Sequence, residues 1–194
     1  MQSHTHRPSH RRSPLHGIRV PLLLALLAAL WAGPTAAATK AEIDARVSGA
    51  LETLYERSPA ARELSGKAAG ILVFPRILKA GFGLGGEYGE GSLLVGGSPV
   101  QYYRVAGASV GFQIGGQARA QVLMFMTDES LATFRASNGW EVGVDGSVAV
   151  VEFGVGEDLT SRSAQEPIIG FVFGNKGLMY NLSLEGTRFW KVVK

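Results

Sequence analysis

The first feature that could do chemistry is a run of glycines in residues 79–91, KAGFGLGGEYGEG. Gly81, Gly83 and Gly86 spell G-x-G-x-x-G, a spacing with which a loop binds the pyrophosphate of a dinucleotide. That chemistry needs a helix directly after the glycines, because the amino end of the helix binds the phosphate. The 14 residues that follow contain four further glycines and a proline. Each glycine costs a helix about 1 kcal/mol and the proline about 3 kcal/mol, so we predict no nucleotide site.

The same glycines also fit the period of a β-strand. Gly81, Gly83 and Gly85 alternate with Phe82 and Leu84, whose side chains then point to the opposite face of the strand. A strand face without side chains lets another backbone or a helix approach closely. We therefore predict a glycine-lined strand against which the N-terminal helix or a second sheet packs.

The first 38 residues have the three parts of a secretory signal peptide. Residues 1–19 carry four arginines and no acid, and residues 20–32 form an uninterrupted apolar run. Ala36 and Ala38 supply the small residues of a cleavage site. A helix over 20–32 would rise about 20 Å, less than the roughly 30 Å of hydrocarbon in a bilayer. We predict cleavage after Ala38 and export, by the Sec route in preference to the twin-arginine route. Without a lipobox cysteine, the product is not a lipoprotein.

Removal of this leader changes the charge and the chemistry of the chain. The leader holds four of the 19 Lys and Arg residues and none of the 16 Asp and Glu, so residues 39–194 carry a formal charge of −1. A nearly neutral chain has no general attraction for nucleic acid, which we exclude as a partner. All four histidines lie in the leader and the chain has no cysteine. Ser-His-Asp and Cys-His catalysis and a typical zinc site are therefore absent from the mature sequence.

Carboxylates are the remaining candidates for catalysis. Glu87 and Glu90 flank Tyr88, and a pair of carboxylates can hydrolyse a glycosidic bond. Nothing in the sequence brings a chosen pair together. We therefore predict that the protein is not an enzyme and that it uses no cofactor and no metal.

Two kinds of periodicity divide the mature chain. Residues 39–69 are predicted to be helical. One apolar stripe is formed by Ile43, Val47, Ala50, Leu51 and Leu54, and Ser58-Pro59 begins a second short helix. Residues 70–194 form a glycine-rich β region of ten short β-prone runs, with hairpin turns predicted at Asp145-Gly146 and at residues 174–177. One internal helix is expected over residues 128–137, capped by Thr127. The predicted fold is α+β, a β-rich single domain of short antiparallel strands, sandwich or barrel-like, with N-terminal amphipathic helices.

Four blocks of sequence, in the same order, closely resemble the SYLF domain family. They are FPRILKAGFGLGGEYGEG at 74–91, VLMFMTDESLATF at 122–134, GWEVGVDGSVAV at 139–150 and FGNKGLMYNLSLEGTRF at 173–189. The resemblance extends from about Leu51 to the C-terminus, and the leader places the chain with the exported bacterial members, often called lipid-binding. It implies a compact β-rich domain with flanking helices and a location in the periplasm. Eukaryotic relatives bind phosphoinositide membranes and some fungal ones bind actin.

The N-terminal segment departs from the basic amphipathic segment to which lipid binding in this family has been tied. Residues 39–67 hold five basic and five acidic side chains, so an anionic surface gains little from this segment. We therefore do not expect phosphoinositide specificity. The predicted function is a non-enzymatic lipid- or membrane-binding module of the bacterial periplasm, whose partner is a phospholipid or a membrane surface.

The expected lipid contact lies where basic and apolar residues precede the glycines. It consists of Phe74, Arg76, Ile77, Lys79 and Phe82. The simpler interpretation is that these are core residues whose two cations extend to solvent. For the whole protein, the alternative function is a structural or protein-interaction component of the cell envelope. Such a protein would bind an envelope partner or form a homo-oligomer through its glycine-lined strands.

Overall fold

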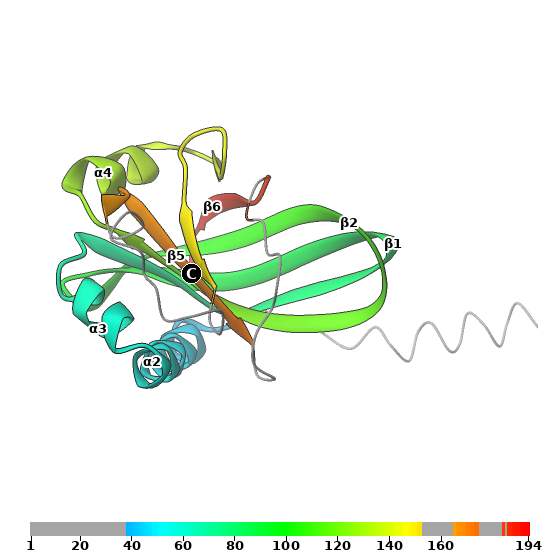
Figure 1. The fold of residues 1–194 in the computed structure, drawn as a ribbon, viewed down its shortest axis with the longest axis horizontal. Coiled ribbons are helices and arrows are strands. Elements are labelled where there is room, and N and C mark those ends of the chain that lie inside the picture. The colour runs from blue at the N-terminus through cyan, green and yellow to red at the C-terminus, as the bar shows by residue number, and fades with distance from the viewer. Residues whose placement is uncertain (1–37, 153–164, 175–183, 185) are drawn as a thin grey trace, which may run out of the picture. The chain divides into compact units, whose positions relative to one another are not determined.

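The helices and strands are known for most of the chain after the leader. The computed structural model describes residues 38–152, 165–174, 184 and 186–194, with side chains throughout except at 80–84, 108–117 and 152. These residues form three helices and six strands (Figure 1). They are α2 (Lys40–Arg57), α3 (Pro59–Ser65), β1 (Gly70–Val95), β2 (Ser98–Phe125), α4 (Asp128–Ala136), β3 (Trp140–Glu141), β4 (Ala149–Glu152), β5 (Ile168–Gly174) and β6 (Arg188–Val192).

Capping residues define where the helices begin. Thr39 and Glu42 form a capping box at α2, in which the Thr39 backbone N–H donates to Glu42 Oε2 at 2.9 Å and the Glu42 N–H donates to Thr39 Oγ1. Ser58 caps α3 with Pro59 in its first turn, and Thr127 caps α4. The three helices predicted from the sequence are confirmed at these residues.

Two strands, far longer than predicted, dominate the sheet. Two of the ten predicted β-prone runs, at residues 71–74 and 92–95, both belong to β1. This strand has 26 residues, and β2 has 28. Gly96 and Gly97, with φ angles of 57° and 79°, make the turn between the two strands. The prediction of short strands was wrong here, because the glycines do not end the ladder. The strands pass through them with register shifts, one of which lies between Gly81 and Gly83.

Strand β2 lies at the centre of the sheet. It pairs with β1 along one edge, and along the other edge it pairs with β6 at residues 102–106 and with β5 at residues 119–125. The order is β3-β6-β2-β5-β4, with β1 paired to β2 outside this path. The β4–β5 pair is parallel, so the sheet is mixed and not purely antiparallel as predicted. The α+β, β-rich fold class is confirmed.

The β1–β2 hairpin is bent so strongly that the two halves of β1 touch each other. A Cβ atom placed on Gly91 would lie 1.9 Å from the carbonyl oxygen of Val73, and one on Gly89 would lie 2.7 Å from that of Arg76. Backbone therefore approaches closely at Gly89 and Gly91, two further glycines of the same strand. The approaching backbone is the first half of the same strand, not a second sheet or a helix. Strand β1 continues to Val95, so no helix follows the G-x-G-x-x-G motif.

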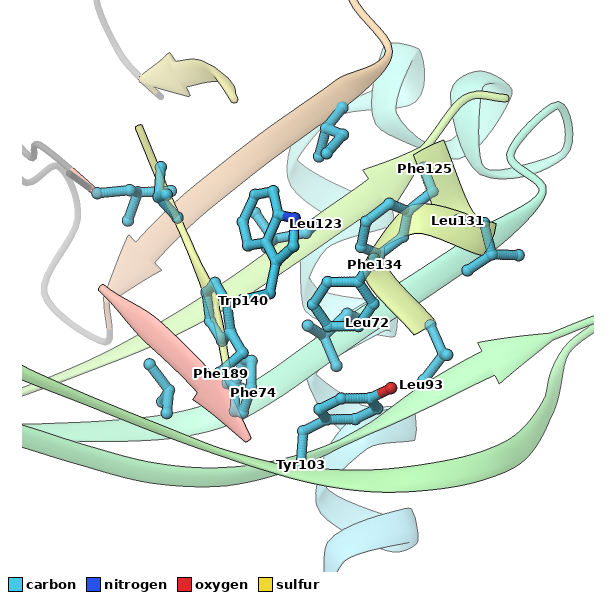
Figure 2. Close-up of a cluster of buried hydrophobic side chains, with 14 of the residues drawn as sticks. Leu72, Phe74, Leu93, Tyr103, Leu123, Phe125, Leu131, Phe134, Trp140 and Phe189 are labelled. Carbon is cyan, nitrogen blue, oxygen red and sulfur yellow. The ribbon is translucent and has the colours of Figure 1, made fainter. Parts of the chain in front are cut away.

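Side chains from the two faces of the sheet build two separate cores. The inner cluster contains Leu72 and Phe74, and the outer cluster contains Val73, as alternation along a strand requires. Phe134 of α4 lies at the middle of the inner cluster, among large apolar side chains (Figure 2). Its ring centroid is 4.8 Å from that of Phe125. Figure 1 shows α4 on one side of the sheet and α2 and α3 on the other.

The apolar stripe of α2 covers the outer cluster. Ile43, Val47 and Leu54 are at most 2% exposed, and they pack with residues of β1, β2 and β5. The Tyr102 hydroxyl of β2 also donates to Asp44 Oδ2 at 2.9 Å. The helix is therefore docked on the sheet with its apolar face in the core.

The segment between β3 and β4 does not form the predicted hairpin. Gly143 N–H donates to the Gly146 carbonyl at 2.9 Å, which closes a tight turn. However, β3 pairs with β6 and β4 pairs with β5, so the flanking strands do not pair with each other. The ring of Trp140 lies against Gly146, where an added Cβ would be 2.7 Å from Cζ2. Of the turn predicted at 174–177, residues 175–177 lie outside the described residues.

Candidate functional site

The structure separates four of the five residues expected to contact lipid. Phe74 and Ile77 are fully buried in the inner cluster, where Phe74 stacks on Phe189 at 5.4 Å between ring centroids. Arg76 is exposed and Lys79 is half-buried. The side chain of Phe82 lies outside the described residues. Phe74 and Ile77 therefore cannot meet a membrane while the core stays packed, and lipid contact by Arg76 and Lys79 stays a prediction.

A groove lies between α2, the connection from α3 to β1, and the turn between β1 and β2. Its volume is about 640 Å³, within the range of about 300–1,000 Å³ that is common for small-molecule sites. The α2 residues that line it share one side of the helix, at spacings of three and four residues. The described lining residues are Asp44, Val47, Ser48, Leu51, Tyr55, Ser65, Gly66, Ala68, Gly70, Ile71, Leu94, Gly96, Gly97 and Pro99.

The groove offers both polar and apolar surface, with the apolar part slightly larger. Val47 and Leu94 are buried beneath it, and Leu51, Tyr55 and Ile71 are half-buried along its walls.

The polar side chains at one end of the groove already have partners within the protein. Asp44 accepts from the Tyr102 hydroxyl, and Ser48 Oγ donates to the Asp44 carbonyl at 3.1 Å. Asp44 alone supplies a carboxylate among the groove's described lining residues. The groove is therefore suited to a chain or ring of carbon atoms and has no pair of acids for catalysis.

The groove is partly lined by glycines, which have no side chains to fill it. A Cβ on Gly96 or Gly97 would meet nothing within 4 Å, and both residues have the positive φ angles that glycine tolerates best. The predicted stripe of α2 included Val47 and Leu51, but sequence reasoning did not identify Asp44, Ser48 and Tyr55 beside it as a wall. The available signal was the pair Gly96-Gly97, which supplies no side chains to fill the space next to the helix.

The two carboxylates considered for catalysis lie on opposite faces of β1. Glu87 points inward and forms a buried ion pair with Arg119, at 2.9 Å between Oε2 and Nη2, while Thr187 Oγ1 donates to Glu87 Oε1 at 3.3 Å. Glu90 points outward, and its Oε1 lies 2.8 Å from Lys194 Nζ. Each acid is paired with its own cation, so the two do not form a catalytic pair.

The buried ion pair connects the two halves of the bent hairpin. Glu87 belongs to the second half of β1, whereas Arg119 lies opposite Ile77 in the first half. Desolvation by burial lowers the pKa of the Arg119 guanidinium, and the charge of Glu87 acts in the opposite direction. Arg119 Nε and both polar atoms of the Gln121 side chain are buried with no partner among the described atoms. This pair holds the bend closed from inside the sheet.

In the part of the chain that is described, no three His, Cys, Asp or Glu side chains come together where they could hold a metal ion. No helix within the described ranges is long and apolar enough to cross a bilayer.

Comparison with known proteins identifies the family of part of the chain. Residues 106–192, which run from the middle of β2 through β6, match the family model Ysc84, described as Las17-binding protein actin regulator. Residues 106–192 belong to the SYLF domain family. The SYLF resemblance predicted from the four sequence blocks is thereby confirmed, whereas membership of the exported bacterial branch stays a prediction. A search of curated proteins found no match to this chain.

Proposed function

We propose that this SYLF-domain protein is a non-enzymatic lipid-binding module of the bacterial periplasm. The groove beside α2 would hold the apolar part of a phospholipid. The observation that carries the proposal is the chemistry of the groove, where Val47, Leu51, Ile71 and Leu94 offer apolar contact and Asp44, Ser48 and Ser65 are already hydrogen-bonded within the protein. Such a site gains free energy by removing carbon surface from water, without having to break protein hydrogen bonds.

The docked position of α2 favours binding in the groove over insertion of the helix into a membrane. Lifting α2 off the sheet would expose Ile43, Val47 and Leu54, each of which contributes about 1.5–3 kcal/mol when buried. The total cost, about 5–9 kcal/mol, is comparable to the whole stability of many domains. A lipid that enters the groove avoids this cost because the helix stays in place.

The start of α2 is consistent with export and cleavage after Ala38. The capping box begins at Thr39, the residue that would follow the cleaved bond, so the helix keeps its cap in the mature chain. Lys194 Nζ donates to the Ala38 carbonyl and would lose that partner on cleavage, but it would keep Glu90. The mass of protein recovered from the periplasm tests this, because a mass other than that of residues 39–194 refutes cleavage at this bond.

The alternative function, self-association through glycine-lined strands, is less well supported. Gly89 and Gly91 are in contact with the first half of their own strand, so a second copy cannot use them without opening the bend. The surroundings of Gly81 and Gly83 lie outside the described residues.

Filling the groove with a large side chain tests the proposed site. Ser48 is exposed and lines the groove, whereas Ala45 is exposed on the same helix and does not line it. We expect Ser48→Trp to abolish binding of a fluorescent phospholipid analogue to delipidated protein, and Ala45→Trp to leave binding unchanged. Urea unfolding of both variants shows whether either has lost stability. If the analogue does not bind the unmodified protein, or if Ser48→Trp binds it equally well, the groove is not the lipid site.

A further inference from the structure

The outer face of the sheet continues beyond the N-terminal end of α2, and there it carries an unusual row of side chains. Pairing places Glu90 of β1 opposite Arg104 of β2, and Arg104 opposite Trp190 of β6. The neighbouring row begins with Tyr88, opposite Ala106. Directly paired residues share a face of the sheet. Glu90, Arg104 and Trp190 therefore share one row, and Tyr88, whose hydroxyl donates to Glu90 Oε1 at 3.1 Å, lies beside it. We call Tyr88, Arg104 and Trp190 the Arg104 face.

The adjacent residues show that the Arg104 face points away from the protein interior. Val105 and Phe189, the neighbours of Arg104 and Trp190 along their strands, are buried in the inner cluster. Alternation along the strands then directs the Arg104 face to the opposite side. Tyr88 is 50% exposed, Arg104 is exposed and Trp190 is half-buried. Arg104 and the two rings beside it are therefore accessible from outside.

Arg104 is an unneutralised cation of this surface. Glu90 is in an ion pair with Lys194, and Glu141 of β3 is in an ion pair with Arg188. Among the described side chains, no carboxylate forms an ion pair with Arg104. Its guanidinium carbon instead lies 5.7 Å from the centroid of the Trp190 ring. The charge of Arg104 thus remains available to an external anion.

The chemistry of these three side chains fits the surface of a phospholipid bilayer. A guanidinium binds phosphate oxygens through two parallel hydrogen bonds. Tyr and Trp rings lie preferentially at the level of the lipid headgroups, because each has an apolar body and a polar tip. We infer that the Arg104 face docks on a phospholipid bilayer, with Arg104 on a lipid phosphate and Tyr88 and Trp190 at the headgroup level. This inference deepens the proposed lipid binding and rests on it.

A bilayer explains the Arg104 face better than a soluble phosphate does. The rings of Tyr88 and Trp190 flank the cation and would stay in water around a free phosphate, whereas a bilayer covers them. The face also adjoins the groove. The next row of β2 towards α2 holds Tyr102, whose hydroxyl donates to Asp44 at the end of the groove. A bilayer docked on the Arg104 face would lie next to the α2 end at which Asp44 lines the groove.

Vesicle sedimentation of protein purified from the periplasm tests the inference. The probe is vesicles of phosphatidylglycerol and phosphatidylethanolamine, and the variants are Arg104→Gln and, as the matched control, Arg46→Gln. Arg46 is an exposed arginine of α2. We expect Arg104→Gln to weaken vesicle binding about fivefold, the effect of one cation at an anionic surface, and Arg46→Gln to weaken it less than about twofold.

Tryptophan fluorescence gives a second readout that does not depend on a variant. After removal of the leader the chain contains Trp140, which is 1% exposed, and Trp190, which is half-buried. Iodide should therefore quench mainly Trp190, and vesicles should protect it. If inorganic phosphate alone protects Trp190 from iodide, the Arg104 face binds phosphate and not a bilayer.

The outcomes separate this inference from the proposed function. If the protein binds vesicles and Arg104→Gln binds them equally well, or if Arg46→Gln is the weaker variant, the Arg104 face is refuted and lipid binding stands. If the protein carries lipid in the groove but does not bind vesicles, the Arg104 face is again refuted and the proposed function stands. If it neither carries lipid nor binds vesicles, both fail.

Discussion

Substitution of Gly91 by alanine should disrupt the bend of the β1–β2 hairpin. The missing Cβ position lies 1.9 Å from the Val73 carbonyl oxygen and 2.8 Å from Cδ1 of the Phe74 ring. A carbonyl oxygen is part of the backbone, so it cannot rotate away as the end of a flexible side chain could. The two halves of β1 must therefore move apart to admit a single methyl group.

The expected cost follows from the size of this overlap. Adding a methyl group to a packed interior costs about 1–3 kcal/mol and occasionally more. We expect Gly91→Ala to lie at or above the upper end, about 3 kcal/mol, because the clash is with backbone. Alanine would recover about 0.5–1 kcal/mol through its lower entropy in the unfolded chain, which does not offset this loss. With a urea dependence of about 1–3 kcal/mol per molar, the unfolding midpoint should fall by about 1–3 M.

Gly86→Ala is the matched control in the same strand. Its added Cβ would meet only the Gly107 carbonyl oxygen, at 3.8 Å, which is an ordinary contact. We expect this variant to unfold at the midpoint of the unmodified protein or slightly above it. Urea unfolding followed by circular dichroism measures both variants. If Gly91→Ala and Gly86→Ala have the same midpoint, the two halves of β1 do not pack as described.

Two further predictions concern buried polar groups. Glu87→Gln leaves Arg119 charged without a partner in the interior and should cost about 3–5 kcal/mol. Glu63→Gln, at the exposed pair with Lys67, should lower stability far less, and equal urea midpoints for the two variants would contradict this. Burial raises the pKa of Tyr103 to about 12, so the folded state keeps a proton that the unfolded chain releases near pH 10. As pH rises from about 10 to 12, the free energy of unfolding should therefore fall by about 2–3 kcal/mol more in the unmodified protein than in Tyr103→Phe. Equal falls in the two proteins would refute the raised pKa of Tyr103. At pH 7 Tyr103→Phe should be at least as stable, because the hydroxyl is buried with no partner among the described atoms.

Local signals in the sequence were sufficient for the helices and for the division between helical and β regions. Thr39, Ser58 and Thr127 are side chains that cap helices by themselves, so their effect is visible without any tertiary contact. The apolar stripe of α2 was also visible, but its partner was not. The same stripe can cover a sheet or lie on a membrane, and only the packed structure shows that it covers β1, β2 and β5.

Long-range contacts account for what could not be predicted. A glycine in a strand can end the strand, allow a bulge or admit a neighbouring backbone. Gly91 admits a neighbouring backbone, because the bend brings Val73, 18 positions earlier in the chain, into contact with it. The pairing of Glu87 with Arg119 spans 32 positions and has no local pattern. Phe74 and Ile77 looked like a surface site because Arg76 and Lys79 lie beside them. Alternation and a register shift after Phe74 place the two apolar side chains inside.

Native mass spectrometry of the protein purified from the periplasm tests the central claim, lipid binding in the groove, most directly. We predict a species heavier than residues 39–194 by the mass of one phospholipid, present in the unmodified protein and in Ala45→Trp and absent from Ser48→Trp. A protein that is free of lipid as purified, and that takes up none when incubated with bacterial phospholipid, would contradict the claim.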